Sequence, residues 1–314
     1  MNEENTPATD ASSESSSDTA AVGNADGNTK PIRKTTVANE FKKLGIYVLI
    51  FYLVGGVIIK FSPLYELLLL RPQGKTDLYN SKIDGKEEIT FSNKNGDQIH
   101  GWFFRSPRSK RLVLINHGNA GNIIHRMLIV RDFLQLGCSV FVYDYRGYGA
   151  STGKLSAAGL VEDSEAAYDY ATSKLGFEPE HIILYGESIG TAVTCRLAQE
   201  RKYEALILQS SLSSLPEVAG DGVIWLRTYP EWVYPDPHYN TARIIAGLKG
   251  PFLFIHGMKD KTVPYQHSEK LLALAAEPKT LVPLPNASHN DVQDQDEPIY
   301  FAGIKKFLAD LDAK

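Results

Sequence analysis

The stretch that most constrains this chain is Tyr185-Gly186-Glu187-Ser188-Ile189-Gly190, in which a glycine stands two residues before and two residues after a serine. An apolar run at 181–185 precedes it, and a helix-like segment at 191–199 follows it. A strand, a Gly-x-Ser-x-Gly turn and a helix together form a nucleophile elbow, in which the glycines let strand and helix nearly touch. The dipole of the following helix favours negative charge beside the serine. The pattern therefore predicts that Ser188 is a nucleophile, and it requires a base, an acid and an oxyanion hole elsewhere in the chain.

Strand-like and helix-like segments alternate beyond residue 88. Strands are expected at 88–91, 98–104, 112–115, 139–143, 181–185, 206–208, 251–255 and 279–282, and helices at 123–136, 156–175, 191–199, 265–275 and 297–313. This alternation predicts an α/β fold with a mostly parallel sheet and helices on both faces. Asn95-Gly96 predicts a hairpin that adds an antiparallel edge. Residues 211–249 are irregular and aromatic-rich, and we expect them to form a short lid.

The N-terminal region predicts three segments. Residues 1–40 are rich in small polar residues and are expected to form a disordered tail. Residues 41–61 contain sixteen consecutive uncharged residues, 44–59, and are expected to form a transmembrane anchor. A buried helix of the folded domain and a cleaved signal peptide are the alternatives. Residues 62–74 are expected to be a juxtamembrane linker, and 75–314 the folded domain.

Basic residues predict the orientation of the anchor. Five precede the apolar run and three follow it: Lys30, Arg33, Lys34, Lys42 and Lys43, then Lys60, Arg71 and Lys75. Because cytoplasmic flanks carry the excess of Lys and Arg, this bias favours a single-pass protein with its N-terminus in the cytoplasm and its folded domain on the other side.

Composition excludes several classes of function. The chain has 314 residues, of which 43% are hydrophobic, so it can bury a large core. Its net charge is −4, and no basic stripe with interleaved aromatic residues points to nucleic acid. Cys138 and Cys195 lie in apolar segments and are expected to be core residues. The eight histidines are scattered, and no His-x-x-x-His or Cys-x-x-Cys pair occurs, so we expect no metal site.

Two further residues that could complete a catalytic group with Ser188 follow expected strands. Asp260 follows the strand at 251–255, where a carboxylate can orient a catalytic histidine. His289 follows the strand at 279–282 and is placed to accept the proton of Ser188. Loop salt bridges for Asp260 and a capping role for His289 are the alternatives. The competing residues are His267, Asp236 and Asp291, the last of which is too close in sequence to His289 to orient its ring easily.

Two glycine-rich loops are expected at the same edge of the sheet. Residues 116–122 follow the strand at 112–115, and their backbone N–H groups are suited to an oxyanion hole, with Ile189 supplying a second donor. His117 is expected to shape this loop. In the loop after the strand at 139–143, Asp144 and Arg146 are expected to belong to a buried ion pair rather than to the catalytic group.

The motifs HGNAGN, YDYRGYGAS, GESIGT, HGMKD and SHND together resemble the α/β-hydrolase superfamily, and within it the Bem46-like group, which includes the alpha/beta-hydrolase-domain 13 and 17 types. The resemblance covers roughly residues 85–312. It implies a serine hydrolase with Ser188 as nucleophile, Asp260 as acid and His289 as base, oxyanion donors at Ile189 and Asn119, and no cofactor. The cysteine-rich N-terminus of the type 17 proteins is absent, because no cysteine precedes Cys138.

Members of this group cleave esters or thioesters, some of them in lipidated proteins. The resemblance therefore implies an acylated small molecule, a lipid or a lipidated protein as substrate, and the membrane as partner through the anchor. A membrane-tethered scaffold without turnover and a serine peptidase are the alternative functions. The aromatic residues of the lid either line an acyl pocket, dip into the bilayer, or pack the lid onto the sheet.

Overall fold

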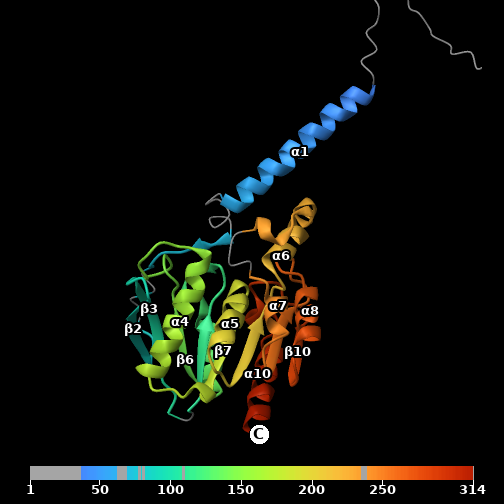
Figure 1. Ribbon diagram of the computed structural model, residues 1–314. Helices are drawn as coiled ribbons and strands as arrows, with labels where there is room; N and C mark the ends of the chain where they lie inside the picture. The colour runs from blue at the N-terminus through green and yellow to red at the C-terminus, as the bar shows by residue number, and fades with distance from the viewer. Residues whose placement is uncertain are drawn as a thin grey trace, which may run out of the picture. The chain divides into compact units, whose positions relative to one another are not determined.

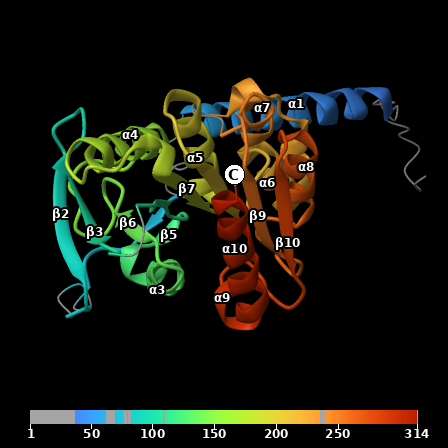
Figure 2. The same cartoon turned by 90° about the horizontal axis from the view of Figure 1, so that it is seen from below.

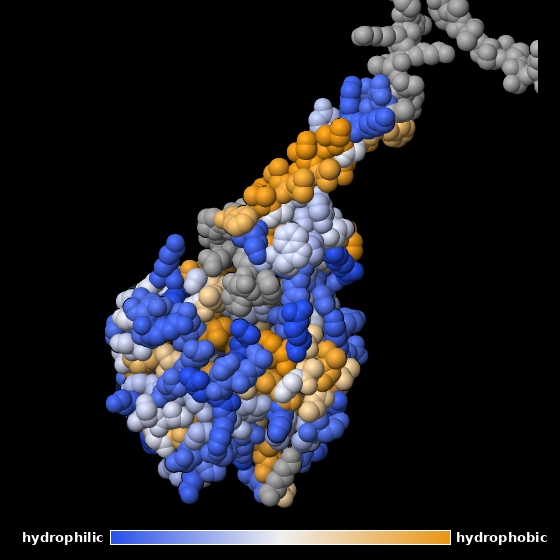
Figure 3. Space-filling view, viewed as in Figure 1, coloured by the Kyte–Doolittle hydropathy of each residue, from blue (hydrophilic) through white to orange (hydrophobic). Residues whose placement is uncertain are grey.

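The computed structural model describes residues 37–61, 69–76, 79, 82–107, 110–234 and 239–313. Residues 1–36 of the expected tail lie outside the described residues, and so do residues 62–68 of the expected linker. The chain divides into two units at a boundary within helix α1 (Val37–Phe61): one unit ends at residue 51 and the other begins at residue 52. Within α1, Asn39–Phe61 is long and apolar enough to cross a membrane, with a mean hydropathy of 2.2 (Figure 3).

The second unit is built on an eight-stranded sheet with the strand order β10-β9-β8-β7-β4-β6-β3-β2 (Figure 1). Neighbouring strands run parallel, except that β3 is antiparallel to both β2 and β6. The predicted hairpin edge is therefore confirmed, with Gly96 at a positive φ of 85° in its turn. The strands are β2 (Lys86–Ser92), β3 (Gln98–Phe104), β4 (Leu112–Asn116), β6 (Ser139–Tyr143), β7 (Ile182–Glu187), β8 (Ala205–Gln209), β9 (Phe252–Gly257) and β10 (Lys279–Leu284).

Helices cover both faces of this sheet, as the alternating sequence predicts (Figure 2). One face packs against α4 (Ala157–Ser173), α5 (Ile189–Glu200), α7 (Thr241–Ile245) and α8 (Gln266–Leu274), and the other against α3 (Met127–Gln135) and α10 (Glu297–Asp312). Successive strand residues point to opposite faces of the sheet. Leu112 and Leu114 therefore belong to the core under α4 and α5, and Val113 and Ile115 belong to the core under α3 and α10. Cys138 and Cys195 are both buried, as expected. The predicted fold class is confirmed.

Some local structure differs from the expectation. The expected helix at 123–136 begins as a 3-10 turn, η2 (Ile123–Arg126), before α3. The lid is not irregular: it contains α6 (Leu215–Gly222), η4 (Ile224–Thr228), η5 (Glu231–Val233) and α7, and its residues 235–238 lie outside the described chain. The remaining short elements are η3 (Pro179–His181), α9 (Val292–Gln295), and the paired strands β1 (Arg71–Pro72) and β5 (Ala120–Gly121), which are too short to show a hydrophobic period.

Candidate active site

Ser188 occupies the sharp turn between β7 and α5. Its backbone angles are φ 53° and ψ −121°, in the positive-φ region that costs a residue with a side chain. The two glycines are required by close approach: a Cβ at Gly190 would lie 2.0 Å from the carbonyl oxygen of Asn116, and one at Gly186 would lie 2.6 Å from that of Gly190. The backbone N–H of Ser188 donates to the carbonyl of Gln209, 2.9 Å away. The sequence context of a nucleophile elbow is thus present in three dimensions.

Three side chains that the sequence singled out meet at the carboxyl ends of the strands. His289, in the loop between β10 and α9, has its Nε2 3.0 Å from Ser188 Oγ. Its Nδ1 lies 2.6 Å from Oδ2 of Asp260, which follows β9. A parallel sheet brings strand ends from distant parts of the sequence to one edge, which explains why residues 101 and 29 positions apart are in contact.

The carboxylate of Asp260 is held on both oxygens. Oδ1 accepts hydrogen bonds from the backbone N–H groups of Thr262 and Val263, each 2.8 Å away. Oδ2 faces His289 and lies 3.2 Å from Nε2 of His256. Burial acts to raise the pKa of Asp260, but the hydrogen bonds from the two histidines outweigh it and hold the pKa well below its usual range. An ionised Asp260 favours the His289 tautomer with its proton on Nδ1, which leaves Nε2 free to accept the proton of Ser188.

The competing residues have other partners. Asp291 accepts a hydrogen bond from the backbone N–H of Ser288, 2.6 Å away. His267 contacts Asp221 through Nε2 at 2.7 Å and the Ser213 hydroxyl through Nδ1 at 2.7 Å. Asp236 lies outside the described residues. The geometry therefore selects Asp260 and His289 over Asp291 and His267 as the groups in line with Ser188.

The loop after β4 carries the expected oxyanion residue. His117 is fully buried, and burial lowers its pKa to about 3, so the imidazole is neutral and packs against aromatic rings as a loop-shaping group. The carbonyl of Asn119 accepts from the Arg71 backbone N–H at 2.9 Å, and its side chain donates to the Leu69 carbonyl at 2.9 Å. Among the described residues, neither the backbone N–H of Asn119 nor that of Ile189 donates to another group.

A buried ion pair that the sequence did not reveal joins the elbow to this loop. Nε of Arg126 donates to Oε2 of Glu187 at 2.8 Å, and Nη2 donates to Oε1 at 3.1 Å. Burial acts to raise the pKa of Glu187, but the charge and hydrogen bonds of Arg126 bring it below its ordinary value. Arg126 also donates to the Ala120 carbonyl, and Gly118 N–H donates to Glu187. Glu187 stands inside the serine motif, but no spacing rule connects it with an arginine 61 residues away.

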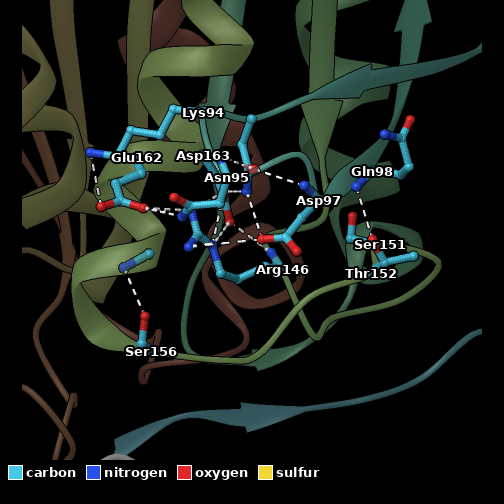
Figure 4. A network of polar contacts seen from close by, with 12 residues as sticks. Lys94, Asn95, Asp97, Gln98, Arg146, Ser151, Thr152, Ser156, Glu162 and Asp163 are labelled. Atoms are coloured by element: carbon cyan, nitrogen blue, oxygen red, sulfur yellow. Dashed lines mark hydrogen bonds and ion pairs between the residues drawn. The ribbon is translucent and has the colours of Figure 1, made fainter.

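A second buried pair supports the loop after β6. Arg146 binds Asp163 of α4, with Nη2 2.7 Å from Oδ1, and also binds Glu162 (Figure 4). Its partner is therefore not the neighbouring Asp144, which instead accepts hydrogen bonds from the Tyr79 hydroxyl and from the backbone N–H of Ile123. Burial raises the pKa of Asp144 to about 6. The predicted buried ion pair is therefore present, but Arg146 forms it with Asp163 and not with Asp144.

A cavity of about 450 Å³ borders His289. Its walls are mainly polar and include Arg126, Glu187, Gln209 and Gln293. Such a wall can hydrogen-bond the polar part of a small molecule next to His289. Across the residues that the structure describes, no three His, Cys, Asp or Glu side chains are grouped to hold a metal ion.

Comparison with known proteins identifies relatives of this chain. The profile of the family described as "Serine aminopeptidase, S33" matches residues 107–246. An uncharacterised protein of Mycobacterium tuberculosis H37Rv is 33% identical over 272 residues, which cover 86% of this chain and 96% of that protein. Alpha/beta hydrolase domain-containing protein 17B of Xenopus tropicalis is 33% identical over 215 residues, covering 68% of this chain and 72% of that protein.

A solved structure shares the fold. The esterase Pf2001 of Pyrococcus furiosus superposes with a TM-score of 0.63 at 18% sequence identity, covering 77% of this chain and 97% of the esterase. At this level of identity the likeness concerns the architecture alone.

Proposed function

Because the chain belongs to the α/β-hydrolase family, we propose that it is a membrane-anchored serine hydrolase that cleaves carboxylic esters or thioesters. The observation that carries this proposal is the line of hydrogen bonds from Ser188 Oγ through the His289 ring to Asp260, at 3.0 and 2.6 Å. A nucleophile, a base and a group that orients the base are the parts that acyl transfer needs.

The reaction has two steps. Ser188 Oγ attacks the acyl carbon while His289 Nε2 takes its proton, and the imidazolium then protonates the departing alcohol or thiol. This leaves an acyl group on Ser188. His289 next takes a proton from water, whose oxygen attacks the acyl carbon, and returns it to Ser188 as the acid leaves. Asp260 stays ionised throughout and stabilises the imidazolium.

Two backbone donors are proposed to hold the negative oxygen that forms in each step. These are the N–H groups of Ile189, at the start of α5, and Asn119, in the loop after β4. The Arg126–Glu187 ion pair supports this assignment because it ties the elbow to that loop, with Gly118 N–H 3.3 Å from Oε2 of Glu187. Each such donor typically contributes about 10²–10³-fold in rate.

Helix α1 is proposed to anchor the enzyme in a membrane, with the N-terminus in the cytoplasm and the folded domain on the other side. Its length and apolar character support the anchor, and the excess of Lys and Arg before the apolar run supports the orientation. Protease added outside sealed membranes should digest the folded domain. Digestion only after the cytoplasmic face is opened would reverse the orientation.

A peptidase is the second candidate, favoured by the description of the matching family profile. An aminopeptidase needs a carboxylate to hold the free amino group of its substrate. In the cavity beside His289, Glu187 is already paired with Arg126, which leaves Asp294 as the other carboxylate on its wall. A scaffold without turnover is disfavoured because hydrogen bonds join Ser188 to His289 and His289 to Asp260.

One assay separates these functions. The full chain in detergent micelles is given p-nitrophenyl butyrate, a butyryl thioester, and leucine or alanine p-nitroanilide. We expect turnover of the first two and loss of turnover in Ser188→Ala. Cleavage of the anilides alone would favour the peptidase, and no turnover of any substrate would favour the scaffold.

A further inference from the structure

The last turns of α1 that belong to the second unit are held against the lid. The Tyr52 and Tyr229 rings stack with centroids 4.3 Å apart. Tyr52 Oη donates to the carbonyl of Thr228 at 2.6 Å, and Tyr229 Oη donates to the carbonyl of Tyr52 at 2.8 Å. Lys60 Nζ donates to the carbonyl of Trp232 at 2.7 Å. Residues 52–61 are thus attached to η4 and η5 by polar contacts as well as by packing.

Two adjacent glycines in α1 make this contact possible. A Cβ at Gly55 would lie 2.4 Å from Tyr229 Oη, and one at Gly56 would lie 3.3 Å from Cε1 of the same ring. Glycine is less favourable than alanine inside a helix. A pair of glycines in an apolar helix is therefore explained here by the close approach of Tyr229.

Next to this contact lies an apolar cavity of about 380 Å³. All ten of its lining residues are hydrophobic or aromatic, and they come from the end of α1, from α6 and η4, and from single positions near them: Ile58, Ile59, Leu69, Leu215, Val218, Ala219, Val223, Trp225, Leu226 and Tyr234. Its volume falls within the range of small-molecule sites. With so little polar wall, it is suited to a hydrocarbon chain and not to a charged or hydrogen-bonding ligand.

The wall of this cavity connects directly with the proposed oxyanion loop. Leu69 lines the cavity, and its carbonyl accepts the side-chain hydrogen bond of Asn119 at 2.9 Å. Leu215 belongs to the same buried cluster as Ile189, the residue after the proposed nucleophile, and Leu69 and Val218 pack against that cluster. Through Leu69 the cavity therefore lies next to Asn119, on one side of the proposed oxyanion hole.

We propose that this cavity holds the fatty acyl chain of the substrate, and that Ile58 and Ile59 of α1 form part of its wall. The inference rests on the proposed function, because it gives the acyl group that Ser188 would receive. The substrate class is then a medium- or long-chain acyl ester or thioester. Each methylene that leaves water for an apolar site favours binding by about fourfold, so kcat/KM should rise with chain length until the cavity is filled.

The test measures kcat/KM of the full chain in micelles with p-nitrophenyl esters from acetyl to hexadecanoyl. Two variants place a larger side chain on the cavity wall, Ala219→Trp in α6 and Ile59→Trp in α1. Two matched variants introduce the same side chain elsewhere: Ala309→Trp on the exposed side of α10, and Val57→Trp, which is 58% exposed in the same part of α1. The quantity compared is the ratio of kcat/KM for the dodecanoyl ester to that for the acetyl ester.

We expect both cavity variants to lower this ratio at least tenfold, and both matched variants to keep it within twofold of the wild type. A ratio that stays unchanged in both cavity variants, or an equal loss on both esters in both of them, would overturn the acyl-chain assignment while leaving the hydrolase standing. If the wild type hydrolyses no ester of any length, the proposed function fails instead. The two failures are therefore distinguishable.

Discussion

Two cavities of the second unit, one beside His289 and one lined by the lid and the end of α1, differ in what surrounds them. The cavity beside His289 has a mainly polar wall that includes the Arg126–Glu187 ion pair, and it opens at strand ends fixed by the sheet. The cavity under the lid is apolar throughout and is built from short helices and the end of α1. The difference suggests two separate roles. The residues at the sheet edge would catalyse the reaction and bind the polar part of the substrate, whereas the lid residues would determine which acyl group binds. Changes at the sheet edge should alter the rate for every substrate, and changes in the lid should alter the preference among substrates.

The largest effect is expected for Ser188→Ala, which removes the attacking oxygen. Loss of the nucleophile in a serine hydrolase typically lowers kcat by about 10⁶-fold, so turnover should fall to background for acetyl and dodecanoyl esters alike. Ser173→Ala, at an exposed position on α4, provides the matched control and should keep kcat within twofold. A loss confined to long chains would contradict the assignment of Ser188 to the reaction.

Asp260→Asn should come next, with a fall in kcat of about 10⁴-fold. The amide no longer favours the His289 tautomer that accepts the proton of Ser188. Asp291→Asn tests the competing carboxylate, which bonds to the backbone N–H of Ser288, and should change kcat by less than about tenfold. If Asp291→Asn were the more damaging change in ester assays, the orienting group would be Asp291.

The Arg126–Glu187 pair is expected to matter for stability at the sheet edge. Arg126→Met leaves Glu187 ionised and largely buried without its partner, and breaking a buried pair in this way typically costs about 3–5 kcal/mol. Urea unfolding of Arg126→Met should show that loss, and the double variant Arg126→Met/Glu187→Gln should recover most of it. Equal unfolding free energies of the single and double variants would show that an unpaired Glu187 does not destabilise the fold.

The lowered pKa of Asp260 predicts how stability depends on pH. A carboxyl group whose pKa is lower in the folded than in the unfolded protein stabilises the fold above its unfolded pKa of about 3.9, and this contribution is lost as the pH falls through the folded value. The difference in unfolding free energy between the wild type and Asp260→Asn should therefore depend on pH. It should be larger at pH 6 than at pH 3, by roughly 1–3 kcal/mol in favour of the wild type. A difference independent of pH would contradict the lowered pKa.

The smallest effect is expected on the outer side of the lid. Ile224 is 69% exposed and does not line the apolar cavity. Ile224→Ser should change the unfolding free energy by less than about 0.5 kcal/mol and should leave the dodecanoyl-to-acetyl ratio within twofold. A large fall in that ratio in micelles would mean that the outer side of the lid, rather than the cavity, contacts the acyl chain.

The strand ends show why so much of the site could be predicted from the sequence. Ser188, Asp260 and His289 each follow an apolar strand, and parallel strands end at one edge, so chain order and strand position together bring them into one place. Gly186 and Gly190 could be assigned a role because a turn this tight excludes a Cβ. Each of these inferences rests on a short sequence pattern, and the parallel sheet then brings the residues of these patterns together.

Other features depend on contacts without a local pattern. Arg126 and Glu187 pair across 61 residues, and nothing in the spacing of either indicates the other. The same holds for Arg146, whose neighbour Asp144 is the obvious candidate partner although Asp163 is the actual one. The lid reads as irregular because its helices span only three to eight residues, too short for a period of 3.6 to be recognised. The packing of Tyr229 on Gly55 and Gly56 likewise has no local pattern in the sequence.

The most direct test of the central claim is to find the residue that an active-site serine reagent modifies. The full chain is treated with a fluorophosphonate, digested, and its peptides are analysed by mass spectrometry. We predict one phosphonylated peptide carrying the adduct on Ser188, with the modification abolished in Ser188→Ala and strongly slowed in His289→Ala. No adduct on the wild type, under conditions that label a control serine hydrolase, or an adduct that persists in Ser188→Ala, would contradict the account.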